Sequence, residues 1–305
     1  MRSTFLFVAT FSAFLLFLQN SSAESKPKIT TLNLAENLYL LMPPEESPSG
    51  NVVVLIGSDG VLLVDSGLPN LASAFQEAID ALKSPNPTIN YIINTHWHRD
   101  HTGGNQTLGK GATIISQENA RKLMSSKQTL LGSTIQSLSE AALPSVTFKD
   151  TITLHFNGEE IRIEHYPNAH TDDDAVIKFT NANVMEIGDI YYGKVLPWVD
   201  SDHGGSLIGL REALHKLISL PESKTIVPGH EKIIGIKELE QEQLVIDESF
   251  ALVEQGIAEG KTLAEIQKKG IGEKWKSWEW VGNSIPRWIE SVYQSVQSKH
   301  PKPGL

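Results

Sequence analysis

Residues 94–105 read Asn94-Thr95-His96-Trp97-His98-Arg99-Asp100-His101-Thr102-Gly103-Gly104-Asn105, so three histidines and an aspartate fall within six residues. The stretch follows a short apolar run at 91–93, which predicts a buried strand. Two histidines two positions apart at a strand end can point to the same side, and the aspartate and third histidine can turn toward a neighbouring position. Imidazole and carboxylate groups together suit zinc, and also iron or manganese. The stretch therefore predicts a metal site.

Three further potential ligands lie downstream, and each follows an apolar run: His170, Asp189 and His230. Because α/β sheets gather their site residues at the carboxyl ends of strands, we expect these side chains to join the same site. The chain contains ten histidines and no cysteine. Thiolate ligands, disulfides and iron–sulfur clusters are therefore excluded, and any metal must be held by His, Asp or Glu.

The surrounding sequence predicts two strand-rich halves that also carry helices. In the first half, runs at 51–56 and 61–64 predict a hairpin, and helical spacing appears at 71–82 and 117–124. From about residue 145 the pattern restarts, with strands near 146, 152, 161–165, 175–179, 184–187 and 225–227 and a helix at 207–220. This order favours a layered α/β arrangement, with two sheets packed face to face and helices outside.

The motif and the order of its separate partners resemble the metallo-β-lactamase-fold superfamily of metallohydrolases, over about residues 50–235. The resemblance implies a four-layer αββα sandwich with a dinuclear centre, most simply two zinc ions, with iron or manganese as alternatives. It assigns the first metal to His96, His98 and His170. It assigns the second metal to Asp100, His101 and His230, with Asp189 as the bridge.

The same resemblance narrows the branch and suggests two more roles. A carboxylate bridge without cysteine looks more like the glyoxalase II and lactonase branches than like β-lactamases with a cysteine ligand. Tyr192 resembles a tyrosine of acyl-homoserine lactonases that polarises a substrate carbonyl, with packing in the cleft wall as the alternative. Asp65 matches a carboxylate that orients metal-bound histidines, with a turn-forming Asp-Ser-Gly as the alternative.

The implied activity is hydrolysis of a small molecule. A hydroxide bridging two metals would attack a carbonyl carbon, and Asp100 would accept or orient its proton. We expect β-lactam hydrolysis slightly ahead of lactone or thioester hydrolysis. More remote alternatives are a di-iron oxidoreductase and a non-catalytic metal-binding protein. Residues 236–305 are too few for the flavin domain that di-iron relatives normally carry.

The chain of 305 residues divides into three predicted segments. Residues 1–23 combine Arg2, an apolar core and small residues at 21–23, which indicates a signal peptide. The apolar core is short of the roughly 20 residues that a membrane anchor needs. We therefore expect a periplasmic or secreted protein, with a catalytic domain at 24–235 and a helical extension at 236–305. The net charge of −10 argues against nucleic acid as a partner.

Several residues outside the motif have competing interpretations. Tryptophans gather in the extension, where they predict a cluster packing it on the body, with a homodimer interface or a pocket wall as alternatives: Trp275, Trp278, Trp280 and Trp288. Lys194 either binds a substrate carboxylate or is a solvated cation, and Trp97 and Trp198 are candidate apolar walls. The acidic run at 172–174 is expected in solvent, and the Pro-rich loop at 43–50 is a candidate flap.

Overall fold

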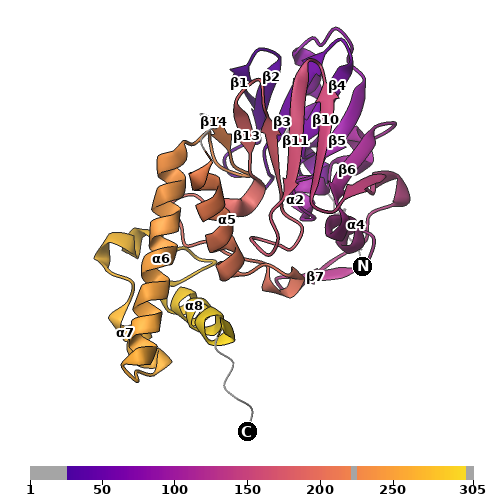
Figure 1. Cartoon of the computed structure of the whole chain (residues 1–305). Helices are drawn as coiled ribbons and strands as arrows, with labels where there is room; N and C mark the ends of the chain where they lie inside the picture. Colours follow the sequence, from indigo (N-terminus) through magenta and orange to yellow (C-terminus); the bar gives the residue numbers. More distant parts are fainter. Residues whose placement is uncertain (1–25, 221–224, 300–305) are drawn as a thin grey trace, which may run out of the picture.

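The computed structural model describes residues 26–220 and 225–299, and the predicted signal peptide lies outside this range. Fourteen strands are described, twelve of them in two sheets (Figure 1). The first sheet has the order β1 (Thr30–Ala35), β2 (Leu38–Met42), β3 (Val52–Gly57), β4 (Gly60–Val64), β5 (Ile89–Ile93), β6 (Thr113–Gln117), β9 (Val146–Phe148). The second has the order β10 (Thr151–Phe156), β11 (Glu159–His165), β12 (Ala175–Phe179), β13 (Val184–Glu186), β14 (Thr225–Val227). A small separate hairpin pairs β7 (Gln128–Leu130) with β8 (Ser133–Ile135).

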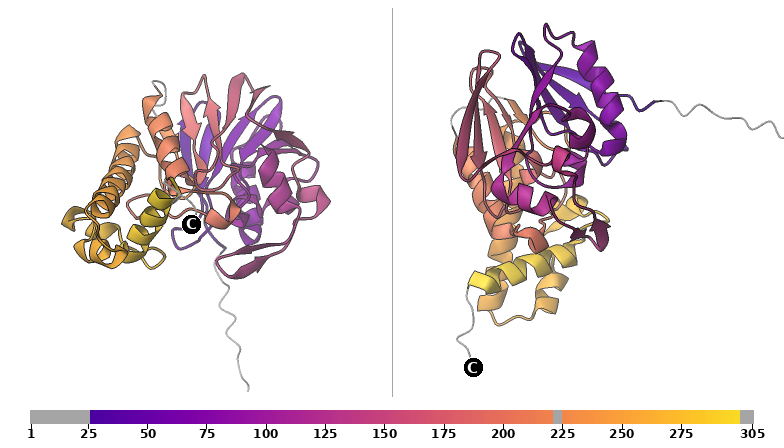
Figure 2. Two further views of the ribbon diagram at one scale, coloured as in Figure 1. Left: turned by 60° about the horizontal axis from the view of Figure 1, so that its bottom comes forward. Right: turned by 90° about the vertical axis from the view of Figure 1, so that its right-hand side faces the viewer.

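The two sheets pack face to face around an apolar core, to which alternate residues of their strands contribute (Figure 2). Leu40, Val53 and Leu62 of the first sheet meet Ile163 and Ile177 of the second. The predicted hairpin at 51–64 is confirmed, because β3 and β4 pair antiparallel. Strands β4, β5 and β6 are parallel, as are β13 and β14, so their carboxyl ends meet at one edge of the sandwich.

Helices cover the outer faces, which completes the predicted four-layer αββα sandwich. The first sheet packs against α1 (Ala72–Ala81) through Phe75 and Ile79. The second sheet packs against α5 (Leu207–Ser219) through Leu210 and Leu214. The remaining helices near the site are α2 (Arg99–Thr102), α3 (Asn105–Leu108) and α4 (Glu118–Met124).

The C-terminal extension contains α6 (Ile236–Ala258), α7 (Leu263–Lys269) and α8 (Ile285–Lys299), beside α5 in Figure 1. One apolar cluster runs from the outer face of the second sheet through α5 into these helices, so the core continues across residue 235. Trp275, Trp278 and Trp288 are buried in that cluster. The predicted packing of the tryptophans against the body is therefore present for three of them, while Trp280 is 39% exposed.

We expect Trp288→Ala to lower the free energy of unfolding by about 3–5 kcal/mol, because a fully buried indole leaves a cavity that its neighbours fill only in part. The substitution also removes the hydrogen bond from Trp288 Nε1 to Ser249 Oγ, which is 2.8 Å long. Urea unfolding followed by circular dichroism measures the change. Leu244→Ala, at a position 45% exposed on α6, is the control and should shift stability by less than about 0.5 kcal/mol. Equal losses in the two variants would contradict the prediction.

Among the elements that were not predicted individually from the sequence are the β1–β2 hairpin, the β7–β8 hairpin and the last helix, α8, which was covered only by the predicted helical extension. The β1–β2 hairpin adds the outer edge of the first sheet. The last helix, α8, had a readable signal, because Trp288, Val292 and Val296 are four residues apart and all buried, and Pro286 lies in its first turn.

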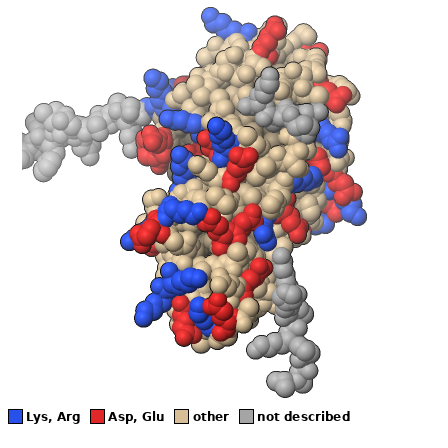
Figure 3. Space-filling view, turned by 60° about the vertical axis from the view of Figure 1, so that its left-hand side comes forward, with Lys and Arg blue, Asp and Glu red and all other residues tan. Residues whose placement is uncertain are grey.

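Among the described residues, no helix is both long and apolar enough to cross a membrane. On the face in Figure 3, acidic and basic side chains are interspersed over the surface.

Candidate metal centre

The seven residues predicted as ligands come together at the edge where strands end. His96 and His98 follow β5, and Asp100 and His101 lie in α2 directly after them. His170 lies between β11 and β12, whereas Asp189 follows β13 and His230 follows β14. The donor atoms form two groups, each with all its atoms within 4.8 Å of one another. The first group contains His96, His98 and His170. The second contains Asp100, His101, Asp189 and His230.

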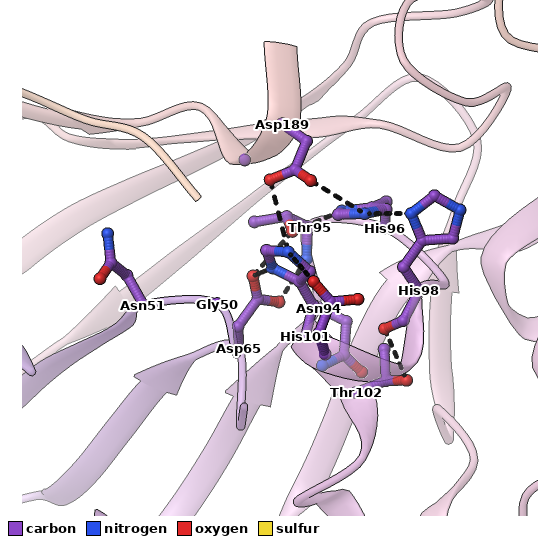
Figure 4. A network of polar contacts seen from close by, with 12 residues as sticks. Gly50, Asn51, Asp65, Asn94, Thr95, His96, His98, His101, Thr102 and Asp189 are labelled. Atoms are coloured by element: carbon purple, nitrogen blue, oxygen red, sulfur yellow. Dashed lines mark hydrogen bonds and ion pairs between the residues drawn. The ribbon is translucent and has the colours of Figure 1, made fainter. Parts of the chain in front are cut away.

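The first group brings three buried imidazole nitrogens to one point. His98 Nδ1 lies 3.0 Å from His96 Nε2 and 3.1 Å from His170 Nε2. Figure 4 shows the rings of His96 and His98 beside Asp189. His96 and His98 come from one segment, and His170 comes from another about 70 residues further along the chain. A backbone hydrogen bond from Ala175 N to Thr95 O joins the two segments.

The outer nitrogen of each ring meets an acceptor, which assigns its tautomer. His98 Nε2 faces the Asp200 carboxylate at 3.0 Å, and His170 Nδ1 faces the Trp198 carbonyl at 3.2 Å. His96 Nδ1 lies 3.0 Å from Thr95 Oγ1, whose own hydrogen goes to Asp65. All three rings therefore donate outward and point lone pairs inward. Converging lone pairs repel one another unless a cation lies between them, so this donor set fits a metal ion.

The protonation equilibria of this group agree with that arrangement. Burial and the neighbouring His98 lower the pKa of His170 to about 4. Burial, together with His101 and His98, also lowers the pKa of His96 well below its ordinary value. These imidazoles are therefore neutral near pH 7, which is the form that binds metals.

The second group combines two histidines with two carboxylates. His230 Nε2 lies 3.0 Å from Asp100 Oδ2, and His101 Nε2 lies 3.3 Å from the same oxygen. Burial lowers the pKa of His230, but the Asp189 and Asp100 charges outweigh it and raise that pKa to about 10. These carboxylates thus favour a positive charge, which a proton or a metal ion can supply. The side chains of Asp100 and His230 are 27% and 38% exposed, so this group faces solvent.

Asp189 lies between the two groups, in the bridging position that the resemblance implies. Its Oδ1 is 3.4 Å from His101 Nε2, and its Oδ2 is 3.7 Å from His170 Nε2 and 3.4 Å from His230 Nε2. Oδ1 has no hydrogen-bond partner among the described residues although it is buried. An orphaned carboxylate oxygen between two imidazole groups is a site that a cation would satisfy.

Asp65 contacts residues of both groups or their direct neighbours, which supports its predicted role in orienting metal-bound histidines over that of a simple turn residue. Its Oδ1 accepts from Thr95 N at 2.8 Å, and its Oδ2 accepts from Thr95 Oγ1 and His101 Nδ1, both at 2.7 Å (Figure 4). The residue has a φ of 61°, a left-handed conformation that aspartate tolerates. His101 therefore presents Nε2 to the second group, with Nδ1–H donated to the carboxylate.

Three orienting contacts were missed by sequence reasoning. Asp200 follows no strand and belongs to no motif, yet its Oδ2 faces both His98 Nε2 and His203 Nδ1, the latter at 2.7 Å. The Trp198 contact uses a backbone carbonyl, which no side-chain pattern reports. Asn51 holds the loop of His230, because its Nδ2 donates to the carbonyls of Pro228 and Glu231.

Two glycines allow the backbone to approach the ligands closely. A Cβ at Gly229 would lie 2.0 Å from Asp189 Oδ1, and one at Gly50 would lie 2.6 Å from His101 Cε1. Real contacts of this kind are never so short, so a larger residue must push the ligand away. These glycines therefore fix the position of Asp189 and His101.

We expect Gly229→Ala to weaken metal binding at the second group by about 10–100-fold, because displaced Asp189 no longer faces His101. Zinc affinity, measured by competition with a chromophoric chelator, tests this. The control is Ala182→Gly, on the turn between β12 and β13, at the opposite end of β13 from Asp189. It should leave metal binding unchanged. Wild-type affinity in Gly229→Ala would contradict the steric argument.

The other predicted residues divide into those near the centre and those away from it. The ring of Tyr192 lies 5.6 Å from that of His170, and burial with the charges of Asp189 and Asp100 raises the Tyr192 pKa well above its ordinary value. Trp198 stacks on His98 at 6.0 Å between ring centroids, and the ring of Trp97 lies 4.9 Å from the same imidazole in an edge-on contact. Lys194 is exposed to solvent.

The expectation that the acidic run at 172–174 lies in solvent is wrong for two of its members. Asp173 and Asp174 are both buried. Asp174 accepts from Thr171 N at 2.9 Å and from Thr171 Oγ1 at 2.6 Å, so it holds the turn that carries His170. Burial raises the pKa of Asp174 to about 7. The local charge run gave no sign of this, because the donors that satisfy Asp174 are supplied by the fold of the turn.

A cavity of about 560 Å³ opens beside the second group. It is lined by His230, Asn51 and Lys232, and by Pro43 and Pro44 of the loop predicted as a flap. This volume is in the range of small-molecule sites. The loop therefore lies at the entrance to the centre.

A family model described as the metallo-beta-lactamase superfamily matches residues 48–230, which include every residue of both groups. The chain belongs to the metallo-beta-lactamase superfamily. Members of this superfamily bind metal ions, typically two zinc ions, and the site described above supplies the corresponding histidine and aspartate donors.

The relatives of this chain carry more than one named activity, and the chain spans 59% and 62% of the length of the first two curated relatives that it matches. A hydroxyacylglutathione hydrolase from Pelagibacter ubique is 27% identical over 165 residues, which cover 52% of this chain and 59% of the relative. A solved metallo-beta-lactamase from Pontibacter korlensis matches 72% of this chain and 99% of its own, with 17% identity and a TM-score of 0.59. A variant of the sec-alkyl sulfatase PisA1 matches 90% of this chain and 52% of its own, with 13% identity and a TM-score of 0.69. The two structures show a shared fold.

Proposed function

We propose that this protein is a di-zinc hydrolase that cleaves thioesters or other activated esters of small carboxylic acids. The observation that carries the proposal is the carboxylate bridge: Asp189 faces the three-histidine group with one oxygen and His101 with the other. In this arrangement His96, His98 and His170 would hold one metal, Asp100, His101 and His230 would hold the other, and Asp189 is placed to contribute to both. The named activity of the Pelagibacter relative supports the thioester branch.

Bound zinc supplies Lewis acidity toward a carbonyl oxygen and toward water at neutral pH. Burial would raise the pKa of Asp100, but the charges and hydrogen bonds of His101 and His230 outweigh it and lower that pKa well below its ordinary value. Asp100 is therefore a carboxylate that can accept a proton at the solvent-facing side of the centre. From there it can pass the proton to the leaving thiolate or alkoxide. The outer partners of the imidazoles keep the lone pairs aimed inward during turnover.

Tyr192 is positioned to orient the substrate. Its ring lies against His170, and among the described residues none accepts its phenol hydrogen. We propose that the phenol donates this hydrogen to the substrate's carbonyl oxygen or leaving group. Trp198 provides an apolar wall over His98 and His170. The cavity beside His230 would take the larger substituent, with Lys232 at its rim.

The test is a hydrolysis panel on zinc-reconstituted protein, with S-lactoylglutathione, an acyl-homoserine lactone and nitrocefin as substrates. We expect the thioester to give the highest kcat/KM. His98→Ala should abolish turnover, while His155→Ala, an exposed histidine on β10, should leave it unchanged. Faster hydrolysis of nitrocefin would favour the β-lactam reading, and full activity in His98→Ala would refute the site.

β-Lactam hydrolysis is the second candidate, and it depends on export. We propose that residues 1–23 are a signal peptide that directs export. The mass of the protein recovered from a cell envelope fraction tests whether this segment is removed. Metal analysis separates the remaining alternatives. Two zinc ions per chain support the proposal, whereas two iron ions with redox-active absorption would indicate the di-iron oxidoreductase.

A further inference from the structure

The C-terminal extension forms hydrogen bonds to two consecutive residues, Leu196 and Pro197, of the loop between Asp189 and α5. The amide of Leu196 donates to the Trp278 carbonyl at 2.8 Å, and Trp280 Nε1 donates to the Leu196 carbonyl at 2.9 Å. Asn283 Nδ2 donates to the Pro197 carbonyl at 2.8 Å, and Asn283 is buried. Three hydrogen bonds from one side fix the path of this short peptide segment.

The next residues of the same loop hold two imidazoles of the first metal group. The carbonyl of Trp198, directly after Pro197, accepts from His170 Nδ1. Asp200 accepts from His98 Nε2 with its carboxylate, and its backbone amide donates to the His170 carbonyl at 2.8 Å. A displacement of Pro197 would therefore move the acceptors that aim both rings.

We infer that Trp280 and Asn283 of the C-terminal extension are positioning residues for the first metal site. They anchor residues 196–197, and through the Trp198 carbonyl and the Asp200 carboxylate they keep His170 and His98 aimed at the metal. Outer partners of metal-bound histidines typically change metal affinity by about 10–100-fold. The inference rests on the proposed metal binding.

The effect is confined to one of the two sites. In the second group His101 is oriented by Asp65, and the loop of His230 is held by Asn51. Neither contact involves the loop that contains residues 196–197. Loosening that loop should therefore lower zinc affinity at the three-histidine site and leave the second site unchanged.

The hydrogen bonds can be separated from the packing of the extension. Trp280 is 39% exposed, so Trp280→Phe removes its N–H donor with little loss of buried surface. Trp275 is buried and donates its own Nε1 hydrogen to Glu248 Oε2 at 2.7 Å, so this hydrogen bond goes to α6 and not to the loop. Trp275→Phe is therefore a matched control, since it deletes the same group from the same extension at a greater cost in packing.

The experiment measures zinc affinity of the full chain by competition with a chromophoric chelator, for wild type, Trp280→Phe, Asn283→Ala and Trp275→Phe. A His230→Ala background leaves only the three-histidine group complete, so it reports the first site. We expect Trp280→Phe and Asn283→Ala each to weaken zinc binding there by about 10–100-fold. Trp275→Phe should bind as wild type does, and urea unfolding checks that all variants are folded.

Two results would overturn the inference alone: wild-type zinc affinity at the first site in both Trp280→Phe and Asn283→Ala, or an equal loss in Trp275→Phe. A wild-type chain that binds no zinc would overturn the proposed function, and this inference with it. The two failures are distinguished by the wild-type measurement, which is made before any variant is compared.

Discussion

Asp189→Asn should lower kcat/KM by about a thousandfold and release metal from the centre. Asp189 has both oxygens within 3.7 Å of imidazole nitrogens from the two groups, and its replacement removes a negative charge that faces both of them. A loss of about 4 kcal/mol of charge stabilisation corresponds to three orders of magnitude in rate. Burial would raise the pKa of Asp189, but His230 and His101 hold it well below its ordinary value. The charge is therefore present throughout the neutral range.

Zinc content after dialysis and kcat/KM for the preferred substrate of the panel are the two measurements. Asp202→Asn, at an exposed position in the loop before α5, is the matched control and should retain metal and activity. Asparagine at 189 is nearly the same size, so the change tests charge more than packing. Two zinc ions per chain together with activity within tenfold of wild type would contradict the bridging role.

Asp65→Asn is the substitution with the second largest expected effect, and it acts on stability as well as on the metals. The carboxylate of Asp65 accepts three hydrogen bonds, and an amide group would turn a donor toward at least one of those donors. Removing one member of a buried charged pair costs about 3–5 kcal/mol. Asparagine tolerates the left-handed φ of 61°, so the backbone is not the cause of this loss.

We expect the metal-free Asp65→Asn protein to unfold at lower urea concentration, and the second metal site to weaken by about 10–100-fold because His101 loses its orienting partner. Urea unfolding in the presence of a chelator separates the stability effect from metal binding. Asp150→Asn, at an exposed position directly before β10, should change neither quantity by more than about 0.5 kcal/mol. If Asp65→Asn behaved like this control, Asp65 would be only a turn residue.

Much of the fold could be predicted because its strands carry an unmistakable pattern. The runs at 52–57 and 60–64 are fully apolar and are buried on both faces, and a turn signal separates them. The helix at 72–81 shows its buried residues at Phe75 and Ile79, one turn apart. By contrast, α8 was predicted only as part of a helical extension, although Trp288 and Val292 are spaced for one face of a helix.

In the candidate site, the metal ligands were predicted from the sequence, whereas most of the residues that orient them were not. Side chains that bind metal must be His, Asp or Glu in a chain without cysteine, and all seven stand near strand ends, where such residues are conspicuous. Residues that hold those side chains need only offer an oxygen. Asp200 is one of many loop aspartates, and the Trp198 carbonyl is a backbone group that every residue has. The same holds for Asp174, whose burial depends on how the turn after His170 folds.

The sequence by itself determined the two sheets, the donor set and the edge where the donors collect, because local apolar runs set where strands end and chemistry limits which residues can be ligands. Only the tertiary structure decided how each ring is aimed. The contact that fixes His98 joins residues 102 positions apart, and the one that fixes His101 joins residues 36 apart. Such contacts form where loops and the C-terminal extension pack together, and packing between distant segments leaves no period in the chain.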